Sequence, residues 1–499
     1  SSSLTGGLQR RMGGHRFLSP FLLRLTSADQ VSMRKPSNEV VRTGKRKRKA
    51  RKHISEVKKI DLKSQRSIAK TTKRKKRKRK LKANQMIKEK RKHIPEDILL
   101  YNLLPFLPAK SLFRFKSVCR RWNSLVSGST SFAWDQCRSY ACPSGLFYNE
   151  HRRRPWEHGF IPISPSSVGV PDPTLSFTKR RLVVLASSNG LLLCRPSYGR
   201  YVVCNPATKE WTALRWKAAH SQIGFAFDPS ASPPGFTIVC IALHWLPAAM
   251  LGDHGAGKVE CSFHVYSSST GWREPSGRAV VPSAKWYGDS LFAGGLIHWR
   301  VNTTVLSFNP NTDVPHVTPL PELSTGARHY CRLGEMRGRL SCINVVDRAQ
   351  LQVWVMEAAS WAKVYSVPVT RIFRKNLGVL ESSSGCDDDD DEEEEKKKTT
   401  LPGGDEEGNA KPDGKEVKSK IRALVRTCPI KPLPSMGDDI LFLWMRRRVF
   451  SFHIPTTRLT ELYLSQNRAK IRFFPYINNL APLREISDAH GRERTELMS

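Results

Sequence analysis

The sequence predicts a multidomain protein of the α+β class, with a basic arm, a small helical module and a large all-β domain. Three observations predict this order. Two dense clusters of lysine and arginine lie within the first 92 residues, a strongly apolar helical stretch follows them, and strand-like runs alternate with turn residues through the rest of the chain. At 499 residues, the chain is long enough for two or more domains.

The positive charge of the chain is concentrated in its N-terminal arm. Residues 1–92 hold 32 Lys+Arg against 5 Asp+Glu, a net charge of +27 within a chain total of +39. Like charges repel one another and few apolar residues are present to collapse around, so residues 1–91 are expected to be a disordered arm. The two clusters begin with the following residues: Lys45, Arg46, Lys47 and Arg48, then Lys73, Arg74, Lys75, Lys76 and Arg77.

Such clusters fit more than one function. An extended and accessible basic segment suits a nuclear-import signal, which predicts the nucleus as the location, with a cytoplasmic pool left open. The same charge could neutralise phosphates and bind nucleic acid without sequence specificity. The arm lacks interleaved aromatic residues for base stacking, so specific single-strand recognition is not expected. A merely solvating tail is the third interpretation. Residues 1–30 also share their composition with organelle transit peptides, although an unstructured leader is the favoured interpretation.

The helical stretch from Lys92 to Ser127 carries more apolar surface than it can bury alone. Pro95 suits the first turn of a helix, and the two prolines at 105 and 108 break the helix and force a turn. A second run then repeats apolar residues at spacings of three and four. A unit of this size rarely builds its own core. It either packs on the C-terminal domain as a helical hairpin or leaves an apolar patch open to a partner.

The order of residues in this stretch resembles the F-box family. The matching elements are Ile94–Leu99 (IPEDIL), Leu107–Leu112 (LPAKSL) and Val118–Trp122 (VCRRW). The resemblance implies an F-box at residues 92–135 that docks on a Skp-type adaptor and, through it, on a cullin-based ubiquitin ligase. Carried across by position, the residues of the adaptor contact or its supporting core are Pro95, Ile98, Leu99, Leu103, Leu107, Pro108, Leu112, Val118 and Trp122. Which of them face the adaptor is left open.

Residues 140–480 read as β-structure with a loosely repeated unit. A strand and a glycine turn lead to a second strand that ends in a polar turn, often with Trp or Thr next. Such repetition is typical of propeller blades, each too small to bury its own face. The phrases at 189–192, 204–208 and 295–299 resemble the F-box-associated β-domain of plant F-box proteins, which is related to kelch-type propellers. A twisted β-sandwich is the alternative, and the number of blades is left open.

Residues 382–420 are expected to interrupt the β-domain as a solvated linker. Asp387 to Glu395 is an unbroken run of nine acids, and a stretch rich in Gly, Pro, Lys and Glu follows it. A segment of this composition is not expected to form a core. A masking contact between the acidic run and the basic arm is a further hypothesis, because opposite charges on flexible tethers attract at low salt. Residues 481–499 are expected to be a tail.

Several functional classes find no support in the sequence. Gly252 to Lys258 matches the start of a phosphate-binding loop, but Val259 stands where Ser or Thr would hold magnesium, and a strand follows. The 14 histidines and 11 cysteines form no metal-ligand spacing, and no nucleophile elbow is present. The longest apolar stretch, residues 236–251, is too short and too interrupted to span a membrane. We therefore expect no catalytic residues, no metal, no cofactor and no membrane contact.

The fold class that follows is multidomain α+β: a disordered basic arm, a small three-helix F-box and an all-β propeller-like domain. The expected function is that of a non-catalytic substrate receptor, in which the F-box docks on the adaptor and the β-domain binds a target protein of unknown identity. Two alternatives remain. One is a basic nuclear protein that associates with nucleic acid and uses the F-box as an assembly handle, and the other is an enzyme on a propeller scaffold.

Overall fold

The computed structural model describes most of the chain beyond residue 94, together with a short piece of the arm. The described residues are 77–78, 95, 97–150, 157–164, 171–196, 200–214, 222–246, 258–282, 285–321, 330–381, 414–465 and 471–488. The chain divides into two units, residues 1–93 and residues 94–499. Arg77 and Lys78 are exposed and helical. The rest of both basic clusters and the acidic run Asp387–Glu395 lie outside the described residues. The disorder of the arm therefore stays a prediction.

Five short helical elements begin the second unit. They are η1 (Ile98–Leu103, a π-helix), η2 (Leu104–Phe106, a 3₁₀-helix), α2 (Ala109–Phe115), α3 (Arg120–Gly128) and α4 (Thr130–Ser139). A regular α-helix cannot run through Pro105, which lacks an N–H and whose ring would clash with the carbonyl of Tyr101. Leu107 and Pro108 have extended backbone between η2 and α2, so the predicted helix break is confirmed. Cys119 Sγ accepts a hydrogen bond from the Trp122 N–H at 3.5 Å and so caps α3.

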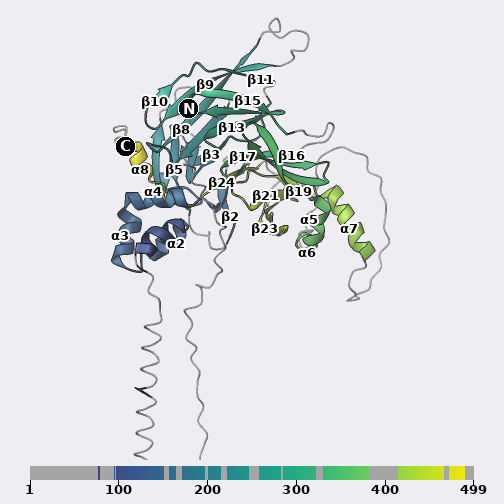
Figure 1. The fold of residues 1–499 in the computed structure, drawn as a ribbon, viewed down its shortest axis with the longest axis horizontal. Coiled ribbons are helices and arrows are strands. Elements are labelled where there is room, and N and C mark those ends of the chain that lie inside the picture. The colour runs from purple at the N-terminus through teal and green to yellow at the C-terminus, as the bar shows by residue number, and fades with distance from the viewer. Residues whose placement is uncertain are drawn as a thin grey trace, which may run out of the picture. The chain divides into compact units, whose positions relative to one another are not determined.

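Six antiparallel sheets follow the helices (Figure 1). The first contains β3 (Leu182–Ser188), β4 (Leu191–Pro196), β5 (Tyr201–Asn205) and β6 (Glu210–Leu214). The second contains β7 (Gln222–Asp228), β8 (Gly235–Trp245), β9 (Val259–Ser267) and β10 (Gly271–Arg273), with β11 (Ala279–Val281) paired to β9. The third contains β12 (Leu291–Ala293), β13 (Leu296–Val301), β14 (Thr304–Asn309) and β15 (Val314–Pro319).

The fourth sheet contains β16 (Tyr330–Met336), β17 (Arg339–Val346), β18 (Gln350–Glu357) and β19 (Ser360–Pro368). The fifth contains β20 (Lys431–Pro432), β21 (Ile440–Met445), β22 (Arg448–His453) and β23 (Arg458–Leu464). The sixth contains β24 (Ile471–Tyr476), β1 (Gly145–Glu150) and β2 (Glu157–Pro162). Neighbouring sheets meet through β24 and β3, β3 and β7, β7 and β12, β12 and β16, and β16 and β20.

These contacts make a six-bladed propeller, which confirms the predicted fold class and replaces the β-sandwich alternative. The sixth blade pairs the beginning of the β-domain with its end, since β1 lies between β2 and β24, with Phe147 opposite Phe474. Phe147 also meets Tyr476 edge to face, with ring centroids 5.1 Å apart. The ring is completed by an apolar cluster between the sixth and fifth blades: Leu146, Ile161, Leu433, Phe442, Val449 and Phe473.

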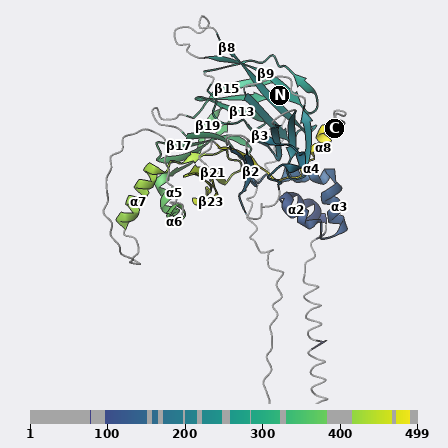
Figure 2. The same cartoon turned by 180° about the vertical axis from the view of Figure 1, so that it is seen from behind.

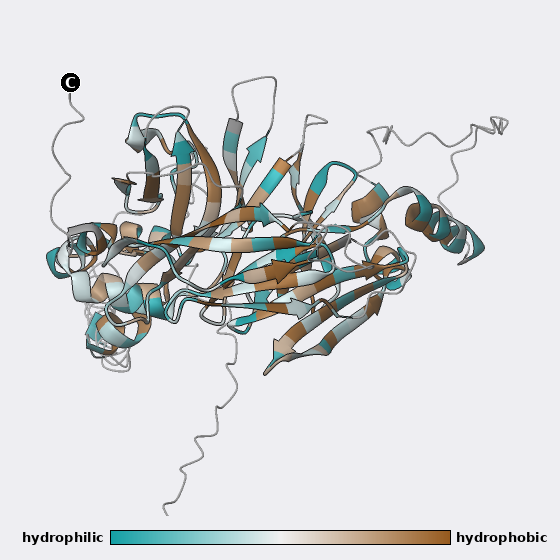
Figure 3. Ribbon diagram, turned by 90° about the horizontal axis from the view of Figure 1, so that it is seen from above, coloured by the Kyte–Doolittle hydropathy of each residue, from teal (hydrophilic) through white to brown (hydrophobic). Residues whose placement is uncertain are grey.

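The alternation of residues along the strands explains how blades pack on one another. In β3 every second side chain from Leu182 to Ser188 is buried, as expected for a pleated strand with one face on a core. Figure 3 shows the alternation of hydrophobic and hydrophilic residues along many of the strands. The turn between β3 and β4 contains Gly190 at φ +92°, and a Cβ there would lie 2.1 Å from Asn479 Oδ1. The glycine at position 190 is thus required by a close contact with the C-terminal segment.

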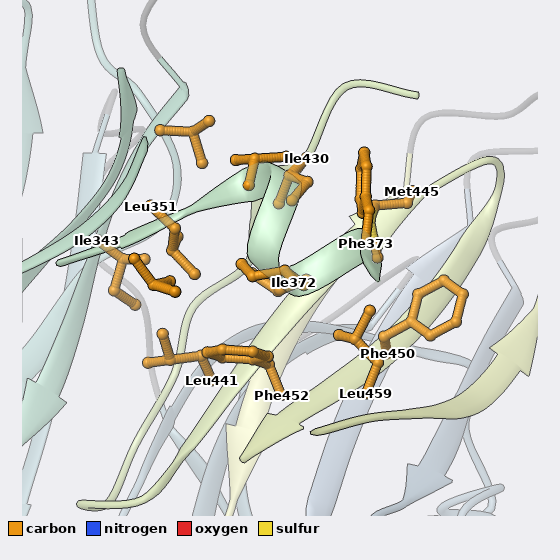
Figure 4. Packing of buried hydrophobic residues seen from close by; sticks show 14 of the residues in the cluster. Ile343, Leu351, Ile372, Phe373, Ile430, Leu441, Met445, Phe450, Phe452 and Leu459 are labelled. Carbon is orange, nitrogen blue, oxygen red and sulfur yellow. The ribbon is translucent and has the colours of Figure 1, made fainter. Parts of the chain in front are cut away.

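A helical insertion lies between the fourth and fifth blades. It consists of α5 (Val369–Lys375), α6 (Leu377–Glu381) and α7 (Gly414–Thr427), of which α5 and α7 pack together. Ile372 and Phe373 of α5 are fully buried, and Figure 4 shows them among side chains of the fifth blade. Ile421 of α7 belongs to the same core. The expected linker 382–420 therefore overlaps a packed helix, because the apolar residues of α7 recur on one face that finds a partner in α5.

The C-terminal segment also packs further than expected. The start of the expected tail 481–499 forms α8 (Leu483–Asp488), which contacts β6. Ala481, Leu483 and Ile486 are buried in the core shared by the first and second blades. Figures 1 and 2 show α8 beside α4, while the insertion of α5, α6 and α7 lies at a different edge of the β-domain. Across the described part of the chain, no helix has both the length and the apolar character needed to cross a membrane.

Candidate functional site

The helical module is joined to the propeller by one shared apolar core. Its inner side chains are Leu100, Leu104, Ala109, Leu112, Val126 and Phe132, and they meet Ala207 and Leu480 of the propeller domain. The backbone N–H of Ala109 donates to the Asn478 carbonyl oxygen at 3.2 Å. The module therefore buries one side against its own chain, as the helical-hairpin alternative predicts.

Other apolar side chains of the module are exposed to water. Five of the large hydrophobic residues of η1, η2 and the loop after α2 are exposed, and we call them the apolar ledge: Ile98 (44% exposed), Tyr101 (61%), Leu103 (41%), Phe106 (57%) and Val118 (59%). Scattered single apolar residues are common on protein surfaces, but five within 21 residues of sequence indicate an interaction site. The module thus combines both expectations, with one side packed on the propeller and another available to a partner.

The nine residues assigned to the adaptor contact or its supporting core divide into three groups. Four are exposed: Pro95, Ile98, Leu103 and Val118. Four are partly buried: Leu99, Leu107, Pro108 and Trp122. Leu112 is fully buried and therefore belongs to the supporting core. The structure thus separates side chains that a partner can reach from those that hold the helices in place, which the motif alone left open.

Two exposed members of the ledge were not among those nine residues. Tyr101 lies in η1 and Phe106 ends η2, and both are more exposed than Leu103. The sequence contained a signal for them, because both belong to the apolar run between Ile98 and Leu107. Motif positions alone did not select them.

Trp122 stabilises the hairpin between α2 and α3. Its ring meets Phe115 in an edge-to-face contact with centroids 5.5 Å apart and an interplanar angle of 67°. Both side chains are partly buried against the shared core of the module. Aromatic pairs of this geometry contribute roughly 0.5–1.5 kcal/mol beyond the area they bury. Trp122 is thus placed to shape the module from within, with only part of its surface open.

The residues that the structure describes offer no cluster of metal ligands, and Cys137, Cys261 and His298 are buried. The described residues contain no group of three His, Cys, Asp or Glu side chains able to hold a metal ion. Burial raises the pKa of the Cys137 and Cys261 thiols to about 12, which disfavours the reactive thiolate. His298 is held between Ser307 Oγ at 2.8 Å and the Ala293 carbonyl oxygen at 3.1 Å, which gives it a structural role within one blade.

The structure is that of a modular protein. A helical module with an exposed apolar ledge packs on a six-bladed propeller. The family described as F-box domain matches residues 93–133. F-box protein At5g07610 of Arabidopsis thaliana is 30% identical over 300 residues, which cover 54% of this chain and 70% of that protein. The chain therefore belongs to the F-box protein family.

Other relatives extend the match into the propeller. F-box protein At5g49610 of Arabidopsis thaliana is 27% identical over 296 residues, covering 55% of this chain and 78% of that protein. F-box/kelch-repeat protein At3g23880 of the same plant is 25% identical over 296 residues, covering 54% and 78%. These matches confirm the resemblance to plant F-box proteins with a kelch-like β-domain. Among solved structures, an oligogalacturonate lyase in complex with manganese aligns with a TM-score of only 0.27 at 11% identity, covering 45% of this chain and 62% of that one.

Proposed function

We propose that this chain is the substrate-recognition subunit of a Skp-cullin-F-box ubiquitin ligase. In this proposal the F-box docks on a Skp-type adaptor and the propeller binds a target protein. The single observation that supports it most directly is the apolar ledge, because the packed side of the module leaves these residues in water.

The energetics favour a partner for the ledge. Full burial of one large apolar side chain stabilises a complex by roughly 1.5–3 kcal/mol. A few such anchors usually carry most of the affinity of an interface. Phe106 and Tyr101 offer the largest side chains of the ledge and are its natural anchors, with Leu103 between them in sequence.

The mechanism would be proximity, without chemistry by this chain. Holding a target near a charged ubiquitin carrier raises its effective concentration. Such a mechanism requires a defined geometry between the two binding surfaces. Buried hydrogen bonds support that geometry: Gln136 of α4 accepts from the Leu480 N–H at 2.8 Å and donates to the Leu107 carbonyl oxygen at 2.9 Å.

The nucleus is the proposed location, with the two basic clusters as the import signal. Their charge and the scarcity of apolar residues support this part of the proposal. The rival function, a nucleic-acid-associated protein that uses the F-box as a handle, is supported by the same charge alone. Nucleic-acid retention that falls steeply with salt and survives loss of the F-box would favour the rival.

The ledge can be tested with a purified Skp-type adaptor and calorimetric titration. Leu103→Ala and Phe106→Ala are each expected to weaken adaptor binding at least about tenfold, because each removes an exposed anchor. Val317→Ala is a matched control, since Val317 is also exposed (40%) but lies on β15 of the propeller.

Deletion of residues 1–91 should leave adaptor binding unchanged. Equal affinities for wild type, Leu103→Ala and Phe106→Ala would remove the ledge from the interface. An unchanged unfolding midpoint in both variants is required for this reading, and the exposure of both side chains makes it the expected result.

A further inference from the structure

A small cavity lies where the first strands of the blades converge. Its lining comes from five of the six blades and includes Ser187 of β3, Asp289 and Ser290 just before β12, Arg332 of β16, Met436 beyond β20 and Phe473 of β24. The cavity measures about 30 Å³. That is roughly twice the space that one water molecule requires. A planar group with two oxygen atoms would fit a cavity of this volume.

The charges around this cavity do not balance. Asp289, whose side chain is 14% exposed, forms an ion pair with Arg472. Arg332 is attracted by Asp289 but repelled by both Arg472 and Arg300, and burial lowers its pKa from the ordinary value. A guanidinium remains charged at neutral pH despite such a shift. Arg332 and Arg472 therefore share the Asp289 carboxylate, and Arg300 adds a third positive charge beside Arg332.

Arg332 is the least satisfied of the three arginines. Arg300 donates to the Cys331 carbonyl oxygen at 2.6 Å and lies over the Tyr287 ring at 4.5 Å. Arg472 has its ion pair with Asp289. Among the residues that the structure describes, the Arg332 guanidinium has no hydrogen-bond acceptor and no ion pair within 4.0 Å. A guanidinium has five donors, so its fork is open to a ligand.

Two hydroxyl groups in the same lining are also unsatisfied. Ser187 Oγ and Ser290 Oγ are both buried without a hydrogen-bond partner. Buried polar groups nearly always have hydrogen-bond partners in native proteins. Two hydroxyl groups without partners at one cavity therefore indicate a ligand or an ordered water. Hydroxyls can donate to an oxyanion, as a guanidinium can.

The backbone is shaped to admit the guanidinium. Gly288 adopts φ +86°, and a Cβ at this position would lie 2.3 Å from Arg332 Nη1. Only glycine takes this conformation without strain, and only the missing side chain allows the close approach. The turn before β12 and the Arg332 side chain thus fit together.

We propose that this cavity binds a carboxylate group, with Arg332 as its main partner and the Ser187 and Ser290 hydroxyls as further donors. A carboxylate matches the forked donors of a guanidinium, and its two oxygens suit the size of the cavity better than the four of a phosphate. The carboxylate belongs either to a small acid or to the C-terminus of a bound protein. The second case rests on the proposed target-binding role of the propeller, whereas the site itself does not.

The test uses the full chain and its thermal unfolding midpoint, with potassium acetate titrated against potassium chloride at equal ionic strength. The midpoint of the wild-type protein should rise with acetate and saturate. Arg332→Gln should weaken the apparent affinity at least tenfold, and Ser290→Ala should weaken it severalfold. Arg339→Gln is the matched control, because Arg339 belongs to the same blade and forms a surface ion pair with Glu357. It should respond as wild type does.

A second readout separates binding from a structural role. Without acetate, Arg332→Gln should unfold at the same temperature as wild type or higher, because it removes a charge that its surroundings do not compensate. A lower midpoint together with an unchanged acetate response would overturn the proposal. So would identical responses of wild type, Arg332→Gln and Ser290→Ala, which would indicate anion binding elsewhere. The basic arm is common to all variants and cannot produce a difference between them.

Two further ligands identify the carrier. Inorganic phosphate that binds more tightly than acetate would overturn the assignment to a carboxylate. Acetyl-triglycine that binds more tightly than acetate, with no binding of its C-terminal amide, would assign the site to a protein C-terminus. Acetate that binds as tightly as acetyl-triglycine, or more tightly, would assign it to a small acid.

Discussion

Gln136 and Leu480 form a buried hydrogen bond that joins the F-box to the propeller, with the Gln136 Oε1 atom accepting from the Leu480 N–H at 2.8 Å. The same side chain donates through Nε2 to the Leu107 carbonyl oxygen at 2.9 Å. Gln136 is fully buried. One side chain thus satisfies two backbone groups, one in the loop between η2 and α2 and one beyond the closing strand of the propeller.

Gln136→Ala is expected to reduce the free energy of unfolding by about 2–4 kcal/mol, because it leaves two buried backbone groups without partners. Urea denaturation of the purified chain measures this difference. Asp135→Ala on the same helix is the control, since the Asp135 side chain is 57% exposed and lies 3.9 Å from the Arg138 guanidinium on the surface. Equal stabilities of the two variants would show that the joint does not depend on Gln136.

Asn205→Ala is expected to cost about 2–4 kcal/mol of stability. The Asn205 Nδ2 atom donates to the carbonyl oxygens of Asn479 at 3.2 Å and Ala481 at 3.0 Å, and Oδ1 accepts from the Ala207 N–H at 2.9 Å. The side chain therefore ties the first blade to the C-terminal segment.

The matched control for Asn205 is Asn309→Ala in the corresponding turn of the third blade. Asn309 Oδ1 accepts from the N–H groups of Asn311 at 2.9 Å and Thr312 at 3.3 Å, both of which lie within three residues along the chain. A loss near 1 kcal/mol is expected there. Similar losses at both asparagines would mean that the tie to the C-terminal segment contributes nothing.

Because His298 is buried, we expect the free energy of unfolding of the protein to fall in mild acid. Burial lowers its pKa from 6.5 to about 4, so the folded state keeps the ring neutral where the unfolded state takes up a proton. As the pH falls from about 6.5 to about 4, the unfolded state binds more protons and the free energy of unfolding decreases, by about 3 kcal/mol in total. Below about pH 4 this contribution is lost completely.

Equilibrium unfolding in urea between pH 7 and pH 4 measures this dependence. His298→Gln should remove most of the slope in that window, although it also reduces stability at neutral pH by disturbing the bonds to Ser307 and Ala293. His316→Gln is the control, because His316 is exposed on β15 of the same blade. A wild-type slope retained by His298→Gln would assign the effect to other groups.

Ile421→Ala is expected to destabilise the protein by about 2–5 kcal/mol, as for other large apolar residues removed from a core. Ile421 is 3% exposed and packs in the core shared by the insertion and the fifth blade. Arg422→Ala, at the neighbouring exposed position, should change stability by less than about 0.5 kcal/mol. If both variants unfold at the same denaturant concentration, α7 does not belong to the cooperative unit.

The F-box illustrates what sequence patterns can predict. Pro105, the apolar run and the motif order predicted a short helical module with more apolar surface than it can bury. The division between Leu112 in the core and Leu103 in the ledge could not be predicted, because both are leucines on short helices. The difference comes from Ala207 and Leu480, which cover one side of the module from distant parts of the chain.

The β-domain shows the same limit. Strand-like runs and polar turns predicted a propeller, but the number of blades and the way the ring closes depend on β1 and β24, which are more than 300 residues apart in sequence. The Gly, Pro, Lys and Glu content of residues 382–420 predicts a linker, but this range includes the first half of α7. Val417, Ile421 and Leu424 nevertheless recur at helical spacing. The polar composition of this stretch hid the helical spacing of its apolar residues. Their role follows from the packing of α7 on α5.

The order of the modules, the charge of the arm, the F-box motif and the β-character of the C-terminal domain can all be read from the amino-acid sequence. These properties reside in neighbouring residues and their spacing. Three features appear only in the folded chain: which apolar side chains of the F-box stay in water, how the sixth blade closes the ring, and the meeting of Asp289, Arg332 and Arg472 beside one cavity. The physical reason is that burial and charge balance are set by contacts between residues far apart in the chain.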